Sequence, residues 1–272
     1  MTDSTEDPSH APLEEPHRAR ALAESFGLDP ERYDRTRPRY PDEMVRAVVD
    51  SLPGPDLLDV GIGTGIAARQ FRAAGCGVLG VEVDARMAQY ARATGLSVDV
   101  ARFETWDARG RTFDGVIAGQ TWHWVDPIAG ARKAAEVLSP GGRLAAFWNV
   151  FALPTELGAA VAAVYRRVLP GSPFSRGVSG GLEAYAALFR TAADGIRQVR
   201  SLGDPDEWRF DWKRSYTKEE WLDQVPTSGG HNRFPDATLA ELLAGLGDAI
   251  DVVGGSFEMR YTAVVVTAVR LG

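Results

Sequence analysis

The sequence contains few of the residues that build disulfide scaffolds, metal sites and membrane spans. Cys76 is the single cysteine among 272 residues, so no internal disulfide can form. No Cys/His cluster has the spacing of a zinc site, and we therefore expect no metal and a reducing, cytoplasmic environment. No apolar run approaches the ~20 residues that cross a bilayer, so no membrane-spanning segment is expected.

Basic residues are also outnumbered by acidic ones, with 30 Lys and Arg against 37 Asp and Glu. The chain carries a net charge of −7 at pH 7 and has a sequence pI near 5.2. A protein that binds nucleic acid needs a basic face to neutralise phosphates. We therefore expect a small molecule, and neither nucleic acid nor a membrane, as the partner of this protein.

What the sequence does contain is a regular alternation of apolar strands with helices of about ten residues. This alternation predicts right-handed βαβ crossovers and a parallel sheet with both faces covered. The expected fold is α/β, a doubly wound, mostly parallel seven-stranded sheet with an N-terminal helical cover and an α-helical insertion. A hairpin between the last two strands completes the sheet. The expected strands are 57–60, 77–84, 97–103, 113–120, 141–149, 208–216 and 257–271.

Four regions follow from these patterns. Residues 1–17 are acidic and Pro-rich, without the basic start and apolar core of a signal peptide, and are expected to be a disordered tail. Residues 18–150 form the α/β core with its cover, which begins with a helix at 17–27. The alternation lapses in 151–206, which indicates a helical insertion, and 207–272 complete the sheet.

A glycine-rich turn follows the first strand. In DVGIGTG, Gly61, Gly63 and Gly65 lie between that strand and a helix, where missing Cβ atoms let the backbone approach a ligand. About 20 residues later Glu82 ends the second strand, where a carboxylate can bind ribose hydroxyls. Ile66 occupies the place of the third glycine in a dinucleotide fingerprint, so a nicotinamide cofactor is the weaker interpretation.

These residues resemble a known family. The series DVGIGTG, VEVDARM, FDGVIAGQTWHWVD and LSPGGRLAAFWN is similar in order and spacing to the motifs of class I S-adenosylmethionine-dependent methyltransferases. The segments AESFGLDPERYDRTRPRYP, SGGHNRF and GGSFEMRYTAVVVTAVR resemble the two ends of a bacterial subgroup with a WHW motif after the fourth strand. The resemblance covers nearly everything after about Arg20, but most members of that subgroup have no assigned acceptor.

The resemblance implies a site for S-adenosylmethionine. Asp59 and the three glycines are expected at the methionine end, Glu82 at the ribose, and Val83 with Met87 at the adenine, although Met87 is equally suited to the core. Phe103 and Glu104 replace the usual acidic residue and its small neighbour, which leaves the adenine contact open. The other expected cofactor residues are Gln120, Thr121, Tyr33 and Arg37; Arg37 suits a carboxylate of either cofactor or acceptor, or a surface ion pair.

The acceptor is expected beside the ends of the fourth and fifth strands, because ligands of open α/β sheets bind there. His123 is the candidate general base for a hydroxyl or amine acceptor, and a structural role in the turn is its alternative. The expected substrate residues are Tyr40, Trp122, Trp124, Asn149, Trp212 and His231. The last two also suit a buried strand face and an exposed loop, respectively.

Two other functions remain open at this point. One is a catalytically idle module that binds S-adenosylmethionine, and the other is a nicotinamide-dependent oxidoreductase, for which we find no catalytic Tyr-Lys pair. The sequence indicates neither the methylated atom nor a choice between monomer and homodimer.

Overall fold

The computed structural model describes residues 24–172 and 181–272. The expected tail and most of the helix expected at 17–27 lie outside these residues. The described end of that helix is a 3₁₀ turn, η3, Glu24–Leu28. None of the helices within the described ranges has the length and apolar character that crossing a bilayer requires.

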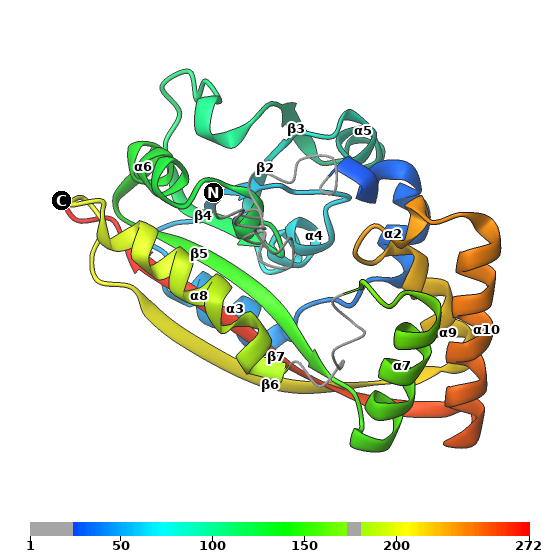
Figure 1. Ribbon diagram of the computed structural model, residues 1–272. Coiled ribbons are helices and arrows are strands. Elements are labelled where there is room, and N and C mark those ends of the chain that lie inside the picture. The colour runs from blue at the N-terminus through cyan, green and yellow to red at the C-terminus, as the bar shows by residue number, and fades with distance from the viewer. Residues whose placement is uncertain (1–23, 173–180) are drawn as a thin grey trace, which may run out of the picture.

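Seven strands form one sheet in the order β3-β2-β1-β4-β5-β7-β6 (Figure 1). The pairs within β3-β2-β1-β4-β5 are parallel, and β7 runs antiparallel between β5 and β6. The predicted doubly wound sheet and its closing hairpin are therefore confirmed. The strands are β1 (Asp56–Val60), β2 (Gly77–Glu82), β3 (Ser97–Val100), β4 (Phe113–Gly119), β5 (Leu138–Ala152), β6 (Asp206–Thr217) and β7 (Ser256–Val269).

Helices cover both faces of the sheet (Figure 1). On one face α3 and α4 bury Met44, Val48 and Phe71 against the strands, and on the other α6 and α8 bury Ala131 and Phe189. The helices are α2 (Pro30–Thr36), α3 (Asp42–Asp50), α4 (Ile66–Ala73), α5 (Ala85–Ala93), α6 (Pro127–Val137), α7 (Thr155–Val168), α8 (Gly181–Arg197), α9 (Lys218–Gln224) and α10 (Asp236–Val252). Short 3₁₀ turns are η4 (Phe103–Thr105), η5 (Trp122–Trp124), η7 (Val225–Thr227) and η8 (His231–Arg233).

The last strands extend past the parallel part of the sheet. The pairing of β4 with β5 ends at Phe147, whereas β5 continues beside β7 to Ala152. A second hydrophobic cluster forms on this extension, where α7, α9 and α10 pack together (Figure 1). Thr217 begins α9 with a capping box, in which its side chain and that of Glu220 accept hydrogen bonds from each other's backbone N–H groups.

The N-terminal cover is attached to both parts of the molecule. Asp34 in α2 pairs with Arg69 in α4 at 2.5 Å, and Arg32 pairs with Asp223 in α9 at 2.9 Å. The helix α2 thus bridges the glycine-loop side of the sheet and the helices of the extension, and it closes the space between them.

Candidate functional site

A cavity of about 810 Å³ lies at the carboxyl ends of the parallel strands. This is where ligands of open α/β sheets bind. We refer to its two sides as the glycine-loop end, with Asp59, Gly63, Thr64 and Glu82, and the helical end. The helical end comprises Val161 and Tyr165 of α7, Trp221 of α9, Leu246 of α10 and Tyr261 of β7.

The three glycines of the loop are required for different physical reasons. All have positive φ, which side chains rarely tolerate. A Cβ at Gly61 would lie 2.1 Å from the Thr121 side chain, and one at Gly65 would lie 2.2 Å from Leu96, so both are required by packing. A Cβ at Gly63 would meet nothing nearer than a backbone oxygen at 4.0 Å. Gly61 and Gly63 line the cavity, whereas Gly65 does not, contrary to its expected place at the ligand.

Glu82 holds the glycine loop in place through its carboxylate. Its Oε2 accepts a hydrogen bond from the Gly63 N–H at 2.8 Å, and its Oε1 accepts from the Val83 and Asp84 N–H groups at 2.8 and 2.9 Å. Burial raises the pKa of this carboxyl, and the three amide donors oppose that rise. With one bond on Oε2 and two on Oε1, Oε2 retains the freer lone pair for a ligand hydroxyl.

Asp59 lies beside Glu82 with a polar atom left unsatisfied. Its side chain is buried at the end of β1, and Oδ2 has no hydrogen-bond partner. Burial raises its pKa well above the ordinary carboxyl value, and the nearby charge of Glu82 raises it further. Leaving such an oxygen unpaired is costly, so this site favours a ligand that donates a proton or carries positive charge.

Thr64 is a lining residue that the sequence analysis did not single out. Its hydroxyl is buried at the same end of the cavity and likewise lacks a hydrogen-bond partner. Its position between Gly63 and Gly65 in the sequence was the available signal, because residues inside a ligand-binding turn share the close approach of the backbone.

The expected adenine side is present at the ends of β2 and β3. Val83, Met87, Phe103 and Glu104 all line the cavity. Glu104 Oε1 accepts a hydrogen bond from the Asp126 N–H at 3.2 Å, which leaves its second oxygen available to a ligand. Phe103 is buried and is one of these lining residues.

Gln120 and Thr121 connect β4 to the glycine loop. Gln120 has a φ of 55°, a conformation that costs energy outside glycine and that occurs most often at functional sites. The Thr121 hydroxyl donates towards the Gly61 and Gly119 carbonyls at 3.1 and 3.2 Å, and the Gln120 amide donates to the Asn149 carbonyl at 3.3 Å. Strained backbone is thus held in place by contacts from both neighbouring strand ends.

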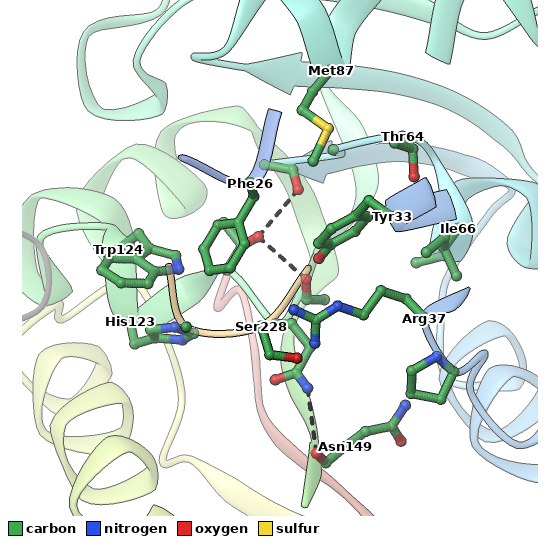
Figure 2. A pocket seen from close by; sticks show the side chains of 18 of the residues that line it. Phe26, Tyr33, Arg37, Thr64, Ile66, Met87, His123, Trp124, Asn149 and Ser228 are labelled. Atoms are coloured by element: carbon green, nitrogen blue, oxygen red, sulfur yellow. Dashed lines mark hydrogen bonds between the residues drawn. The ribbon is translucent and has the colours of Figure 1, made fainter. Parts of the chain in front are cut away.

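The WHW motif separates into three environments. Trp122 is buried in the core and does not line the cavity, so it is not in the expected substrate position. Trp124 lines the cavity and packs edge-on against Phe26 at a ring distance of 6.3 Å. Figure 2 shows Trp124 next to His123, with Phe26 between Trp124 and Tyr33.

His123 does not have the geometry of a general base. Its Nδ1 accepts a hydrogen bond from the buried indole N–H of Trp148 at 3.1 Å. An indole N–H can only donate, so the neutral imidazole carries its proton on Nε2. Burial lowers the pKa of His123 to about 4. This geometry argues against the expected role of His123 as a general base, because Nδ1 is engaged by Trp148 and Nε2 carries the proton.

Two other expected substrate residues lie behind the cavity wall. Trp212 stacks on Tyr261 with ring centroids 4.4 Å apart and donates to Asn149 Oδ1 at 3.2 Å. His231 is buried, with Nε2 2.8 Å from the Tyr165 hydroxyl. Neither residue lines the cavity in this structure; both contact residues that do line it.

The cover and the fifth strand contribute lining residues as expected. Tyr33, Arg37, Tyr40 and Asn149 all face the cavity. The Asn149 amide donates to the Arg39 carbonyl at 3.1 Å and accepts from Trp212, so its side chain mainly ties the cover to β5 and β6. Within the described residues, no group of three or more His, Cys, Asp or Glu side chains has the arrangement of a metal site.

The aromatic helical end was missed by the sequence analysis. Tyr165, Trp221 and Tyr261 come from α7, α9 and β7, which are far apart in the chain. A helical insertion was expected at 151–206, but the pattern of one helix does not indicate which apolar residues meet at a shared cavity.

Known proteins share both the sequence and the fold. Residues 58–146 match a family model described as a methyltransferase domain. Uncharacterised methyltransferases of Mycobacterium bovis and Mycobacterium tuberculosis are 35% identical over 133 residues. That match covers 48% of this chain and 54% of each relative, so the chain spans about half the length of the curated relatives it matches.

A solved structure extends the similarity to most of the chain. A candidate type II methyltransferase from Anaeromyxobacter dehalogenans aligns with a TM-score of 0.61 and 21% identity, covering 86% of this chain and 98% of that one. At this identity the likeness shows the fold. Together with the family model over residues 58–146 and the curated relatives, it confirms the resemblance to class I methyltransferases that the sequence indicated.

Proposed function

We propose that this protein transfers a methyl group from S-adenosylmethionine to a small-molecule acceptor. The observation that carries the proposal is the pairing of an unsatisfied, buried Asp59 oxygen with the open space above Gly63. A ligand can approach the backbone closely at Gly63 and place a positive group beside Asp59. The amino group of the cofactor carries that charge. When bound, S-adenosylmethionine supplies an electrophilic methyl group on a sulfonium sulfur.

The residues of the glycine-loop end fit this cofactor. Asp59 accepts from the cofactor amino group, Glu82 Oε2 accepts from a ribose hydroxyl, and Thr64 offers a hydroxyl to the cofactor carboxylate. Val83, Met87, Phe103 and Glu104 enclose the adenine, and Gln120 and Thr121 position the loop beside the methionine portion. These assignments follow from which lining atoms are unsatisfied and from the family resemblance.

At the methyl group, the chain mainly orients the acceptor and excludes water. Alignment for an in-line displacement accounts for much of the rate in such reactions. His123 donates through Nε2, and burial raises the pKa of the nearby Tyr165 and Tyr185 hydroxyls. None of these side chains is a base near pH 7, so we expect the acceptor atom to have its own available lone pair.

The cavity also supports turnover over an idle binding role. Its volume of about 810 Å³ continues beyond the glycine-loop end to the aromatic residues of α7 and α9. A module that only stores the cofactor has no need of this second space. A nicotinamide cofactor is disfavoured because Ile66, at the start of α4, lines the cavity where a pyrophosphate needs a small residue.

The test is a binding and turnover series on the full chain. Adenosylhomocysteine should raise the melting temperature in a concentration-dependent way and NADH should not, because only a ligand of the native state stabilises it. Methyl-labelled adenosylmethionine should then transfer label to a member of a small-molecule panel. Saturable NADH binding without adenosylhomocysteine binding contradicts the proposal, and cofactor binding without transfer to any candidate favours the idle module.

A further inference from the structure

Arg37 lies apart from the other charged side chains that line the cavity. Among the described residues that line it, the charged side chains other than Arg37 lie at the ends of β1 and β2 or directly after β3. They are Asp59, Glu82, Asp84, Arg102 and Glu104. Arg37 comes instead from the N-terminal cover, directly after α2, and it brings a positive charge to the space beyond the glycine loop.

Arg37 has no counter-ion among the described residues. Its Nη2 donates to the Thr227 carbonyl, while its Nε is shut off from water without a hydrogen-bond partner. The guanidinium lies 4.9 Å from the ring centroid of Tyr33 and 6.0 Å from that of Phe26. No ion pair of Arg37 occurs in the part of the chain that the structure describes. A guanidinium stays protonated at every relevant pH, so its unpaired donor favours an anionic ligand oxygen.

The surroundings of Arg37 favour the acceptor over the cofactor as the source of that oxygen. Its carbonyl partner, Thr227, belongs to η7 on the helical side, and Figure 2 shows the guanidinium directed toward Ser228. Burial raises the pKa of Tyr185 and of Tyr261, and the Arg37 charge opposes both rises. Burial and Glu82 alone account for the raised pKa of Asp59.

The glycine-loop end has its own donor for a cofactor carboxylate. Thr64 Oγ1 is buried, unpartnered and adjacent to Gly63. Arg37 is therefore not needed to satisfy the charge of the methionine portion, and its donor remains for a second ligand.

Much of the wall on the helical side is apolar and aromatic. Val161, Trp221 and Leu246 belong to the hydrophobic cluster on the strand extension, and Tyr165 and Tyr261 present rings from the same cluster. A flat or hydrocarbon ligand body gains from burial against these side chains, because apolar surface leaves water. A fully polar, uncharged ligand would lose hydration here without compensation.

From this arrangement we propose that the methyl acceptor is an apolar or aromatic carboxylate, whose anionic group pairs with Arg37 and whose body packs against the helical end. The inference rests on the proposed function and adds the substrate class of the same cavity. In this arrangement an oxygen of the acceptor carboxylate accepts the hydrogen bond that the Arg37 side chain has available.

The experiment measures binding to the full chain saturated with adenosylhomocysteine. Indole-3-acetate, trans-cinnamate and phenylacetate are compared with their carboxamides, which have nearly the same shape but no charge. Each carboxylate should raise the melting temperature further and bind about tenfold to a hundredfold more tightly than its amide, the range expected for a charge-assisted pair. Arg37→Gln should remove this preference. Arg39→Gln, which removes an exposed charge that does not line the cavity, should retain it.

A second measurement separates the acceptor from the cofactor. 5′-Methylthioadenosine lacks the amino-acid portion of adenosylhomocysteine, so the ratio of the two affinities reports contacts to that portion. Arg37→Gln should leave the ratio unchanged; a collapse of the ratio assigns Arg37 to the cofactor and overturns the proposal. Equal binding of carboxylates and amides, or no binding of either, also overturns it. If wild-type protein fails to bind adenosylhomocysteine, the proposed function itself fails.

Discussion

The two ends of the cavity are built by different physical means. The glycine-loop end uses backbone: Glu82 fixes three amide groups, and the packing of Gly61 and Gly65 sets the turn. The helical end uses side chains that meet only because α7, α9 and α10 pack on the extended strands. The comparison suggests that the first end recognises a constant ligand, whereas the second can change its specificity by substitution without disturbing the sheet.

The strongest way to break the glycine-loop end is Gly63→Val. Its side chain would project into space that the protein leaves open, so we expect loss of adenosylhomocysteine affinity of more than about a hundredfold, because the ligand can no longer approach the backbone. Isothermal titration calorimetry measures this loss. Gly110→Val is the matched control: Gly110 has a φ of 73°, has nothing within 4 Å and does not line the cavity. If both variants bind adenosylhomocysteine with equal affinity, Gly63 does not lie at the cofactor site.

Asp59→Asn should weaken cofactor binding and change how the stability of the free protein depends on pH. Removing the charge that faces the cofactor amino group should weaken adenosylhomocysteine by about tenfold to a hundredfold. The raised pKa of Asp59 means that ionisation destabilises the ligand-free fold. Stability should therefore fall as pH rises from the ordinary carboxyl range through the raised value, and the variant should lose this dependence.

The ionisation of Asp59 should also make the affinity of the wild-type protein for adenosylhomocysteine depend on pH. Binding requires the carboxylate, so affinity should rise with pH through the raised pKa of Asp59 and then level off above that pKa. Affinity that is independent of pH in wild type, together with an unchanged value in Asp59→Asn, would remove Asp59 from the cofactor site.

Glu82→Gln should have a smaller effect on binding but a clear effect on the fold. An amide has one acceptor oxygen where three backbone N–H groups need partners, so the glycine loop should loosen even without ligand. We expect about a tenfold loss of affinity with a lower melting temperature of the free protein. A variant that melts like wild type and binds less tightly would mean that Glu82 acts on the ligand alone.

His123→Gln should have the smallest effect. If His123 only donates, a glutamine amide can replace it, and turnover should change by no more than a few-fold with the same pH profile between pH 5 and 8. A general base would instead be worth roughly 10²–10⁴, with loss of an acid-side limb. Such a loss in a stable variant would restore the base role.

The stability of the same variant provides a second check on His123. Its pKa of about 4 in the folded chain lies below the value of about 6.5 in an unfolded one, so wild-type stability should fall as pH drops from 6.5 toward 4. His123→Gln should show a weaker decline over this interval, measured by urea unfolding at several pH values.

Much of the fold was predictable because its signals are local. Alternating apolar strands and helices specify the parallel crossovers, and Thr217 with Glu220 marks the start of α9 within four residues. The glycine turn and Glu82 were also readable, since the spacing between β1 and β2 brings them together in any sheet of this type. These relations depend on periodicity and short-range geometry.

Where the structure places a site residue differently from the sequence expectation, contacts between residues far apart in the chain decide the position. Nothing near His123 in the sequence reveals that Trp148, 25 residues away, donates to its ring and fixes its proton. In the same way, only packing decides that Trp122 enters the core while Trp124 faces the cavity, although the two are neighbours in one motif. A periodic pattern gives the burial of an element but not the partner of a single polar atom.

The sequence by itself therefore determined the α/β sheet, the glycine turn and its acidic partner, because hydrophobic period and crossover geometry leave few alternatives. Only the tertiary structure decided which side chains share the cavity. The unpaired donor of Arg37, the proton position of His123 and the aromatic helical end each arise from elements distant in the chain, and hydrogen bonding and close packing fix such contacts only once the whole molecule is folded.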